Sequence, residues 1–156
     1  MSIFITIFSG VCVFVLGQVI VKLFIDPVHG YKASVGEVST ALINYTSSYA
    51  NPGVGTKESM DEASKEIRLL ASKLSAQVSM IPCYDKTAKV FFLPCKDNIY
   101  EAKTQLIGLS NGIHQADRGS RKVSLGEINM RKAEKICDLL GIYVPENERM
   151  YKDKNA

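Results

Sequence analysis

The sequence has little of what catalytic and metal-binding proteins use. It contains no tryptophan, two histidines and four cysteines among its 156 residues. The four cysteines lack the spacing of a disulfide framework or a zinc site, which suits a reducing compartment. The chain also lacks a nucleophile elbow, a kinase signature and a nuclease-like set of acidic residues and lysines. We therefore expect a protein that is not an enzyme and that holds no metal ion and no cofactor.

Charge is absent from the beginning of the chain. No charged side chain occurs from Ser2 to Val21, and Lys22 is the first charge. At 1.5 Å per helical residue, about twenty such residues match a hydrocarbon core of about 30 Å. A helix also satisfies its own backbone hydrogen bonds, as lipid requires. The sequence therefore predicts a transmembrane helix over residues 1–26, with Ile3 to Ile25 as its apolar stretch.

Two other interpretations of this stretch are open. A secretory signal peptide needs a basic segment before the apolar run and a small-residue cleavage site after it, and the sequence shows neither. A buried helix that is apolar on all sides is rare in a soluble chain of this size. In the membrane interpretation, Lys22 and Lys32 follow the span and positive residues stay inside. We expect a single-pass protein of the inner (cell) membrane, with its N-terminus outside and the remainder cytoplasmic.

Residues 27–50 are predicted to form a helical stalk after the span. Asp26-Pro27 can begin a second helix, kinked from the first or continuous with it. Its apolar positions alternate in spacings of three and four, as in a heptad seam: Val28, Tyr31, Val35, Val38, Leu42, Tyr45 and Tyr49. Traced backward, the seam meets Phe24, Val21 and Gly17. The seam either packs on the chain's own domain or brings several chains together, and we expect a homo-oligomer, a tetramer.

Residues 51–145 are predicted to form one helical cytoplasmic ligand-binding domain, and residues 146–156 a flexible tail. The segment Asn51 to Lys57 carries one proline and two glycines and marks a loop. Capping boxes open two helices, at Ser59-x-x-Glu62 and Ser124-x-x-Glu127. Further signals are a cap at Asp97, a turn over residues 84–89, a strand or buried connector over residues 90–93, and a helix stop at Gly141. The expected fold class is mainly α.

The apolar stripes of the three predicted helices indicate which side chains form the core. The first stripe consists of Ala63, Ile67, Leu70, Ala71, Leu74 and Val78; the second of Ile99, Ala102, Leu106, Leu109 and Ile113; the third of Leu125, Ile128, the stem of Lys132 or Ala133, Ile136 and Leu140.

A basic segment near the last helix is the candidate binding site. Six cations lie between His114 and Lys135, against Asp117, Glu127 and Glu134: Arg118, Arg121, Lys122, Arg131, Lys132 and Lys135. A loop of cations before a helix N-terminus favours phosphate, and neutral polar side chains nearby can read a base or a ribose. The predicted ligand-binding residues are Asn111, His114, Gln115, Arg118, Arg121 and Lys122. A solvated basic loop and contact with anionic lipid headgroups are the open alternatives. The patch is short and without interleaved aromatics, so we expect no long nucleic acid.

The span, the stalk and the run LIGLSNGIHQADRGSRK at Leu106 to Lys122 together resemble the membrane-bound effectors of type III CRISPR systems that sense cyclic oligoadenylate. The layout, with Asp-Pro after the span, also resembles a broad group of bacterial membrane proteins. The CRISPR resemblance implies a cytoplasmic oligomer that binds a cyclic nucleotide near its symmetry axis and signals to the membrane helices. The expectation is an antiviral defence effector that binds cyclic tetra-adenylate and perturbs the lipid bilayer. The alternative is a membrane-anchored scaffold or adaptor without a nucleotide ligand.

Overall fold

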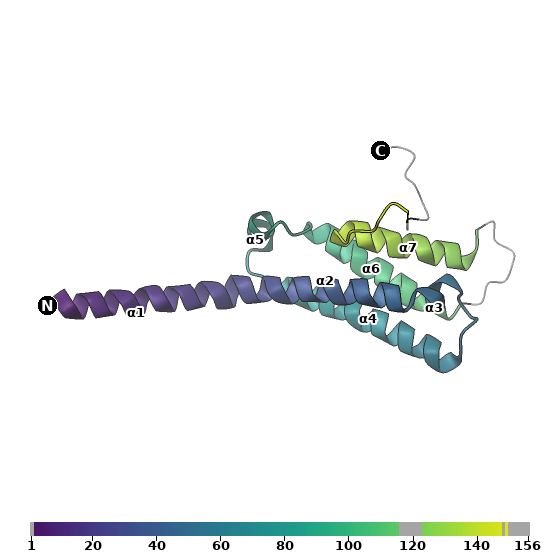
Figure 1. Cartoon of the computed structure of the whole chain (residues 1–156), viewed down its shortest axis with the longest axis horizontal. Coiled ribbons are helices and arrows are strands. Elements are labelled where there is room, and N and C mark those ends of the chain that lie inside the picture. Colours follow the sequence, from purple (N-terminus) through teal and green to yellow (C-terminus); the bar gives the residue numbers. More distant parts are fainter. Residues whose placement is uncertain (1, 116–122, 148, 150–156) are drawn as a thin grey trace.

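The protein is described here from a computed structural model, which describes residues 2–115, 123–147 and 149 (Figure 1). Every regular element in these ranges is a helix and none is a strand, so the prediction of a mainly α fold is confirmed. The elements are α1 (Ser2–Ile20), the π turn η1 (Val21–Ile25), α2 (Asp26–Asn44), α3 (Thr46–Ala50), α4 (Lys57–Met80), α5 (Tyr84–Phe91), α6 (Lys96–Ile113) and α7 (Leu125–Leu140).

One long helix runs from α1 through η1 into α2, spanning Ile3–Asn44 over 42 residues (Figure 1). The π turn lies just before Pro27, which has no N–H and whose ring would clash with the carbonyl four residues earlier. In η1 the Asp26 N–H bonds to the Val21 carbonyl, five residues back. The two helices are thus continuous, and Asp26 is a helical residue with helical backbone angles rather than a cap.

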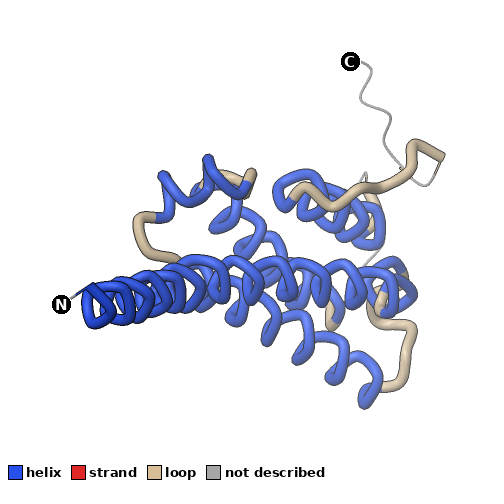
Figure 2. Tube along the Cα trace, turned by 60° about the vertical axis from the view of Figure 1, so that its left-hand side comes forward, coloured by secondary structure: helices blue, strands red, loops and turns tan. Residues whose placement is uncertain are grey.

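Helices α2, α4, α6 and α7 form an antiparallel bundle, with successive helices running in opposite directions (Figures 1 and 2). Each helix of this series packs against the one before it: α4 on α2, α6 on α4 and α7 on α6. All predicted core positions of α4 and α6 are buried, because their apolar residues recur on one helical face. In α7 the prediction was wrong at one position: Ile128 is half-buried, whereas Asn129 is 1% exposed.

The predicted stalk is a packed helix of this bundle. Five of its seam positions are buried against the chain's own core: Val28, Tyr31, Val38, Leu42 and Tyr49. The interpretation that the seam packs on its own domain is therefore confirmed for residues 28–49. The backward extension to Gly17 is wrong as a single face, because the π turn adds one residue and shifts the helical phase by about 100°. Gly17, like the apolar window around it, has no other part of the chain packed against it.

Two predicted helix starts differ from the observed ones. Thr56 caps α4, its Oγ1 accepting from the Ser59 N–H at 3.2 Å, so the helix begins before the expected capping box. Cys95, without a side-chain bond, precedes α6, and Asp97 lies inside its first turn. Local pattern alone does not choose between nearby polar residues as the cap. The Ser124 cap and the Gly141 stop are confirmed.

Helix α5 replaces the predicted turn over residues 84–89, and residues 90–93 form no strand. Its inner face consists of Tyr84, Thr87 and Ala88. The Tyr84 hydroxyl donates to the Pro94 carbonyl, and the Thr87 hydroxyl donates to the Pro82 carbonyl, both at 2.8 Å. These bonds fasten both ends of a helix too short to be recognised by periodicity.

Candidate functional site

Three of the predicted nucleotide-binding residues are described by the structure, and they lie at the C-terminal end of α6. Asn111 is on α6 and its Oδ1 accepts a hydrogen bond from Arg68 of α4. His114 follows the helix, with Nε2 3.6 Å from Oδ1 of Asp61. Gln115 is exposed beside it. Arg118, Arg121 and Lys122 lie outside the described residues. The structure thus brings Asn111, His114 and Gln115 together and places Arg68 and Asp61 of α4 beside them, two residues that the sequence analysis did not name as ligands.

The described cations of the basic segment are bonded within the chain. Arg131 pairs with Glu127 at 2.8 Å, and Lys135 pairs with Glu101. Nζ of Lys132 donates to the Gly108 carbonyl at 3.1 Å, and burial lowers the pKa of this lysine. The C-terminal end of a helix is also the negative end of its dipole. The described cations therefore satisfy groups of the chain itself, and the net charge of the segment overstates its capacity for an anion.

The N-terminus of α7 is covered by α3. Leu125 and Gly126 are buried, and a Cβ on Gly126 would lie 2.0 Å from the carbonyl oxygen of Ala50. Nδ2 of Asn129 donates to the Tyr49 carbonyl at 3.1 Å, which fixes the same junction. Much of the helix end that the sequence suggested for phosphate is thus packed against backbone, and Asn129 is a structural residue that the apolar pattern missed.

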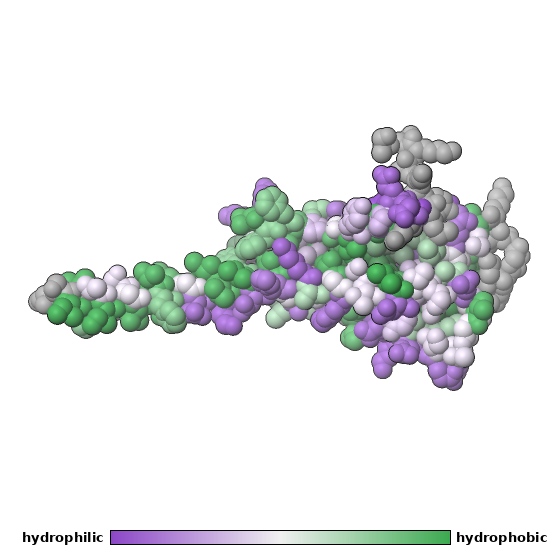
Figure 3. Space-filling model, viewed as in Figure 1, coloured by the Kyte–Doolittle hydropathy of each residue, from purple (hydrophilic) through white to green (hydrophobic). Residues whose placement is uncertain are grey.

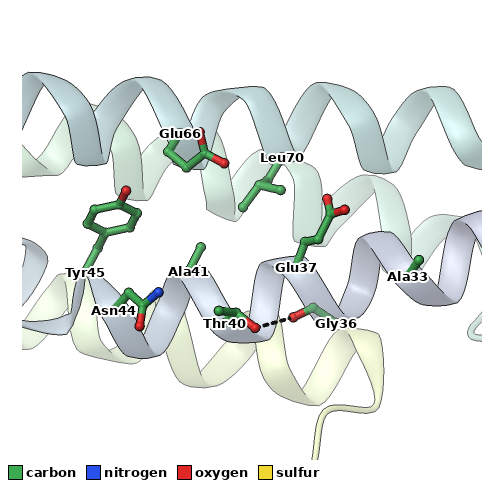
Figure 4. Close-up of a pocket in the computed structure, with 9 residues that line it drawn as sticks. All are labelled: Ala33, Gly36, Glu37, Thr40, Ala41, Asn44, Tyr45, Glu66 and Leu70. Atoms are coloured by element: carbon green, nitrogen blue, oxygen red, sulfur yellow. Dashed lines mark hydrogen bonds between the residues drawn. The ribbon is translucent and has the colours of Figure 1, made fainter.

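A groove of about 600 Å³ lies between α2 and α4 (Figure 4). Four of the residues that α2 contributes to the groove are small (Ala33, Gly36, Thr40 and Ala41), and a Cβ on Gly36 would contact nothing within 4 Å. The lining residues are Ala33, Gly36, Glu37, Thr40, Ala41, Asn44, Tyr45, Glu66 and Leu70. Ala33, Gly36 and Thr40 recur along α2 at spacings of three and four and share this face. Such a face allows the close approach of another helix.

The groove carries acidic groups. Both carboxylate oxygens of Glu37 accept from Nζ of Lys73 at 2.6 Å. Glu66 points into the groove and forms no ion pair with any residue in the described ranges (Figure 4). Burial, and then the carboxylates of Glu62 and Glu66, raise the pKa of Tyr45. A basic side chain entering this groove would find an unpaired carboxylate, whereas an anion would be repelled.

Metal-ligating side chains do not cluster in the described part of the chain. Within residues 2–115, 123–147 and 149, no group of three or more His, Cys, Asp or Glu side chains could hold a metal ion. Cys83 follows the last turn of α4, whereas His114 lies beside Asp61 of its first turns. The part of α4 from Asp61 to Met80, about 29 Å by its rise, therefore separates this thiol from this imidazole.

Helix α1 is long and apolar enough to span a membrane by length and composition. Its best 18-residue window has a mean hydropathy of 2.4, and none of that window is buried against the rest of the chain. Figure 3 shows this apolar surface along α1, with hydrophilic residues beginning where the helix reaches the bundle. There Nζ of Lys22 pairs with Asp26 at 2.8 Å.

No family model matches the chain, and neither a curated protein nor a solved structure matches it.

Proposed function

We propose that the protein is a single-span membrane protein whose cytoplasmic bundle is a docking module, a scaffold or adaptor without catalytic activity. One observation carries this proposal. A single continuous helix is apolar and unburied by the rest of the chain over α1, and it forms part of the packed core over α2. An apolar helix that packs on nothing in its own chain needs another apolar environment, and lipid supplies it.

The proposed orientation follows from the charges around the span. Lys22 lies at the end of the apolar stretch, where a lysine can extend its ammonium to the headgroups. Lys32 follows on the same side, and positive residues remain in the cytoplasm. In this arrangement the N-terminus is outside the cell and the bundle lies inside, with the inner (cell) membrane as the site of anchorage.

The docking site in this proposal is the groove between α2 and α4. Short side chains on α2 let a partner helix approach closely, and Glu66 offers a carboxylate to a basic residue on that helix. Because the groove is built on the same helix that continues into α1, its occupant would be held at a fixed relation to the bilayer. We expect the occupant to be a helix of a partner protein that carries a basic side chain.

Photocrosslinking in cells tests the groove. A benzophenone amino acid replaces Thr40, which is exposed in the groove, or Thr104, which is exposed on α6; each threonine hydroxyl donates to the carbonyl four residues back at 3.0 Å, so the sites are matched. We expect one discrete adduct from position 40 and none from position 104. Glu66→Lys should remove the adduct and Glu58→Lys, on the same helix, should not. Equal adducts at both positions, or an adduct that survives Glu66→Lys, would contradict the docking site.

A second candidate function is the sensing of cyclic oligoadenylate in antiviral defence, with perturbation of the membrane as the output. The observation in its favour is Arg68, which adds a guanidinium beside Asn111 at the end of α6. Calorimetry of the full chain in lipid nanodiscs with cyclic tetra-adenylate tests it. Binding that is weakened at least about tenfold by Arg68→Ala, and by Arg118→Ala or Arg121→Ala, would favour the sensor. If cyclic tetra-adenylate binds no more tightly than linear RNA of the same composition, the sensor function is wrong and the scaffold function is retained.

Self-association is a separate prediction. Since the seam positions of residues 28–49 pack inside the bundle, we expect the homo-oligomer to form through α1, where Gly10 and Gly17 have open space around them. The mass of the detergent-solubilised protein measures it: a tetramer would support the oligomer, and a clean monomer at micromolar concentration would contradict it.

A further inference from the structure

Helix α5 stands at the end of the bundle that adjoins α1. The last turns of α4 lie against the first turns of α2, since a Cβ on Gly30 would be 2.6 Å from Oε1 of Gln77. The chain then passes through Ile81–Cys83 into α5, and Tyr84 comes close enough to Tyr31 of α2 to influence its titration. Figures 1 and 2 both show α5 beside the junction of α1 and α2, away from the loop that joins α3 to α4.

Large apolar side chains are exposed around α5. Phe92 is 93% exposed, Val90 is 70% exposed, and Met80, at the end of α4, is 63% exposed. Phe92 has a left-handed backbone (φ 53°), which ends the helix with its ring in solvent. Figure 3 shows apolar surface over α5 at this end of the bundle. Exposed apolar groups beside an apolar helix of membrane-spanning length indicate an interaction site rather than scattered surface residues.

The outer face of α5 also carries positive charge. Lys86 and Lys89 are exposed, against one acid, Asp85, while Tyr84, Thr87 and Ala88 face the core. Neither lysine forms an ion pair with a residue in the described part of the chain. A short helix that shows aromatic and aliphatic groups beside lysines has the composition of an interfacial membrane contact. Anionic headgroups are the matching charge.

We propose that α5 is a second membrane contact, lying in the headgroup region of the bilayer that α1 spans. Phe92 and Val90 enter the boundary of the acyl chains, and Lys86 and Lys89 lie at the phosphates of anionic lipids. The inference rests on the proposed membrane anchorage of α1. Its consequence is orientation: a single helix can tilt and can rotate about its own axis, whereas a second contact fixes which side of the bundle, and so which side of the groove, faces away from the bilayer.

The absence of tryptophan from the chain gives a direct test. Three single-tryptophan variants of the full chain, Phe92→Trp, Phe14→Trp in α1 and Val54→Trp in the loop before α4, are reconstituted into vesicles of phosphatidylcholine and phosphatidylglycerol. Val54 is 80% exposed at the opposite end of the bundle and serves as the aqueous control. Quenching by brominated acyl chains reports contact with lipid, and quenching by iodide reports contact with water.

Phe14→Trp and Phe92→Trp should be quenched by brominated lipid at least about twofold more than Val54→Trp, and shielded from iodide, because both rings lie in the bilayer or its boundary. If Phe14→Trp is quenched by lipid while Phe92→Trp is as open to iodide as Val54→Trp, the α5 contact is wrong and the anchor stands. If Phe14→Trp is itself open to iodide, the anchor and the proposed function fail. Circular dichroism confirms that each variant folds.

Charge reversal separates the two parts of the contact. Lys86→Glu with Lys89→Glu, in the Phe92→Trp background, should lower the quenching by brominated lipid at least about twofold in vesicles with phosphatidylglycerol. The same change should have a smaller effect in pure phosphatidylcholine. Equal quenching before and after charge reversal in anionic vesicles would overturn the role of the lysines.

Discussion

The two halves of one continuous helix behave differently, and the difference lies in their surroundings rather than in their backbone. Over α1 the side chains are apolar on every side and none of the hydrophobic window is buried. Over α2 they alternate, and six residues are buried by the facing helices. Secondary structure therefore does not distinguish the two halves. The stability of α2 comes from protein packing, and that of α1, in our proposal, comes from lipid.

The same substitution in the two halves should give the sharpest contrast. Val38 is fully buried, so Val38→Asp places a carboxylate in the core and should lower the free energy of unfolding of the bundle by more than about 4 kcal/mol. Val15, in the middle of the span, is 50% exposed, and Val15→Asp should leave the bundle's denaturant midpoint unchanged.

The same two substitutions should have the opposite order of effects on membrane integration, which is measured by extraction with alkaline carbonate. Val15→Asp should make the free energy of membrane insertion less favourable by about 3 kcal/mol, so that more protein is extracted. A second aspartate, Val11→Asp, should increase the extracted fraction further. Val38→Asp should not change the extracted fraction. A bundle destabilised by Val15→Asp would mean that α1 packs on protein, against our account.

Two glycines of α6 test packing around Asn129. A Cβ on Gly112 would lie 2.3 Å from Oδ1 of Asn129, so Gly112→Ala should lower the free energy of unfolding by about 1–3 kcal/mol. At Gly108 the nearest atom would be Nζ of Lys132 at 3.6 Å, an ordinary contact, and Gly108→Ala should raise stability by up to about 1 kcal/mol through helix propensity. Chemical denaturation measures both. Asn129→Ala should partly rescue Gly112→Ala, and failure to do so would show that the crowding lies elsewhere.

Two buried tyrosines of the seam give opposite predictions. The Tyr49 hydroxyl donates to the Leu42 carbonyl at 2.8 Å, so Tyr49→Phe should lower the free energy of unfolding by about 1–2 kcal/mol. The Tyr31 hydroxyl is buried without a partner among the described residues, so Tyr31→Phe should be neutral or raise stability by up to about 1 kcal/mol. Thermal unfolding of the two variants side by side measures the difference, and an equal loss in both would contradict the assigned hydrogen bonds.

A smaller effect is expected at alkaline pH. Burial, with the charge of Asp138 second, raises the pKa of Cys137 from its ordinary value of 9.0 to about 11. Between these values the unfolded chain has released the thiol proton while the folded chain keeps it, so stability falls as pH rises. By pH 10 the loss should be about 1 kcal/mol. Urea midpoints at pH 8 and pH 10 measure it, and Cys137→Ala should show a shallower decline. Equal declines in both proteins would assign the effect to other groups.

Much of the bundle was predictable because its signals are periodic. The stripes of α4 and α6 place every named core residue correctly, and the Ser124 cap and Gly141 stop follow from their own side-chain and backbone preferences. The failures have local causes. A proline-induced π turn shifts the phase between α1 and α2, and a helix of eight residues at α5 is too short for periodicity to be read.

The candidate site was harder to predict because it depends on contacts between helices. The three cations of α7 form ion pairs or a hydrogen bond within the chain. Arg131 pairs with Glu127 of the same helix, while Lys135 and Lys132 bond to Glu101 and the Gly108 carbonyl of α6. The groove depends on the side-by-side placement of α2 and α4, which spacing along one helix does not reveal. Arg118, Arg121 and Lys122 lie outside the described residues, so their role as ligands stays a prediction.

The central claim is that a membrane helix and a core helix are one rigid rod, and a spin–spin distance measures it. Spin labels at the native Cys12 and at Ile43→Cys, with the other cysteines replaced by alanine, are separated by 31 residues along α1 to α2. In lipid nanodiscs, pulsed electron resonance should give one narrow distance near about 46 Å, the rise of an unbroken helix. A broad distribution, or a distance shorter by about 10 Å or more, would show a hinge at residues 21–25 or a folded-back α1, and would contradict the account.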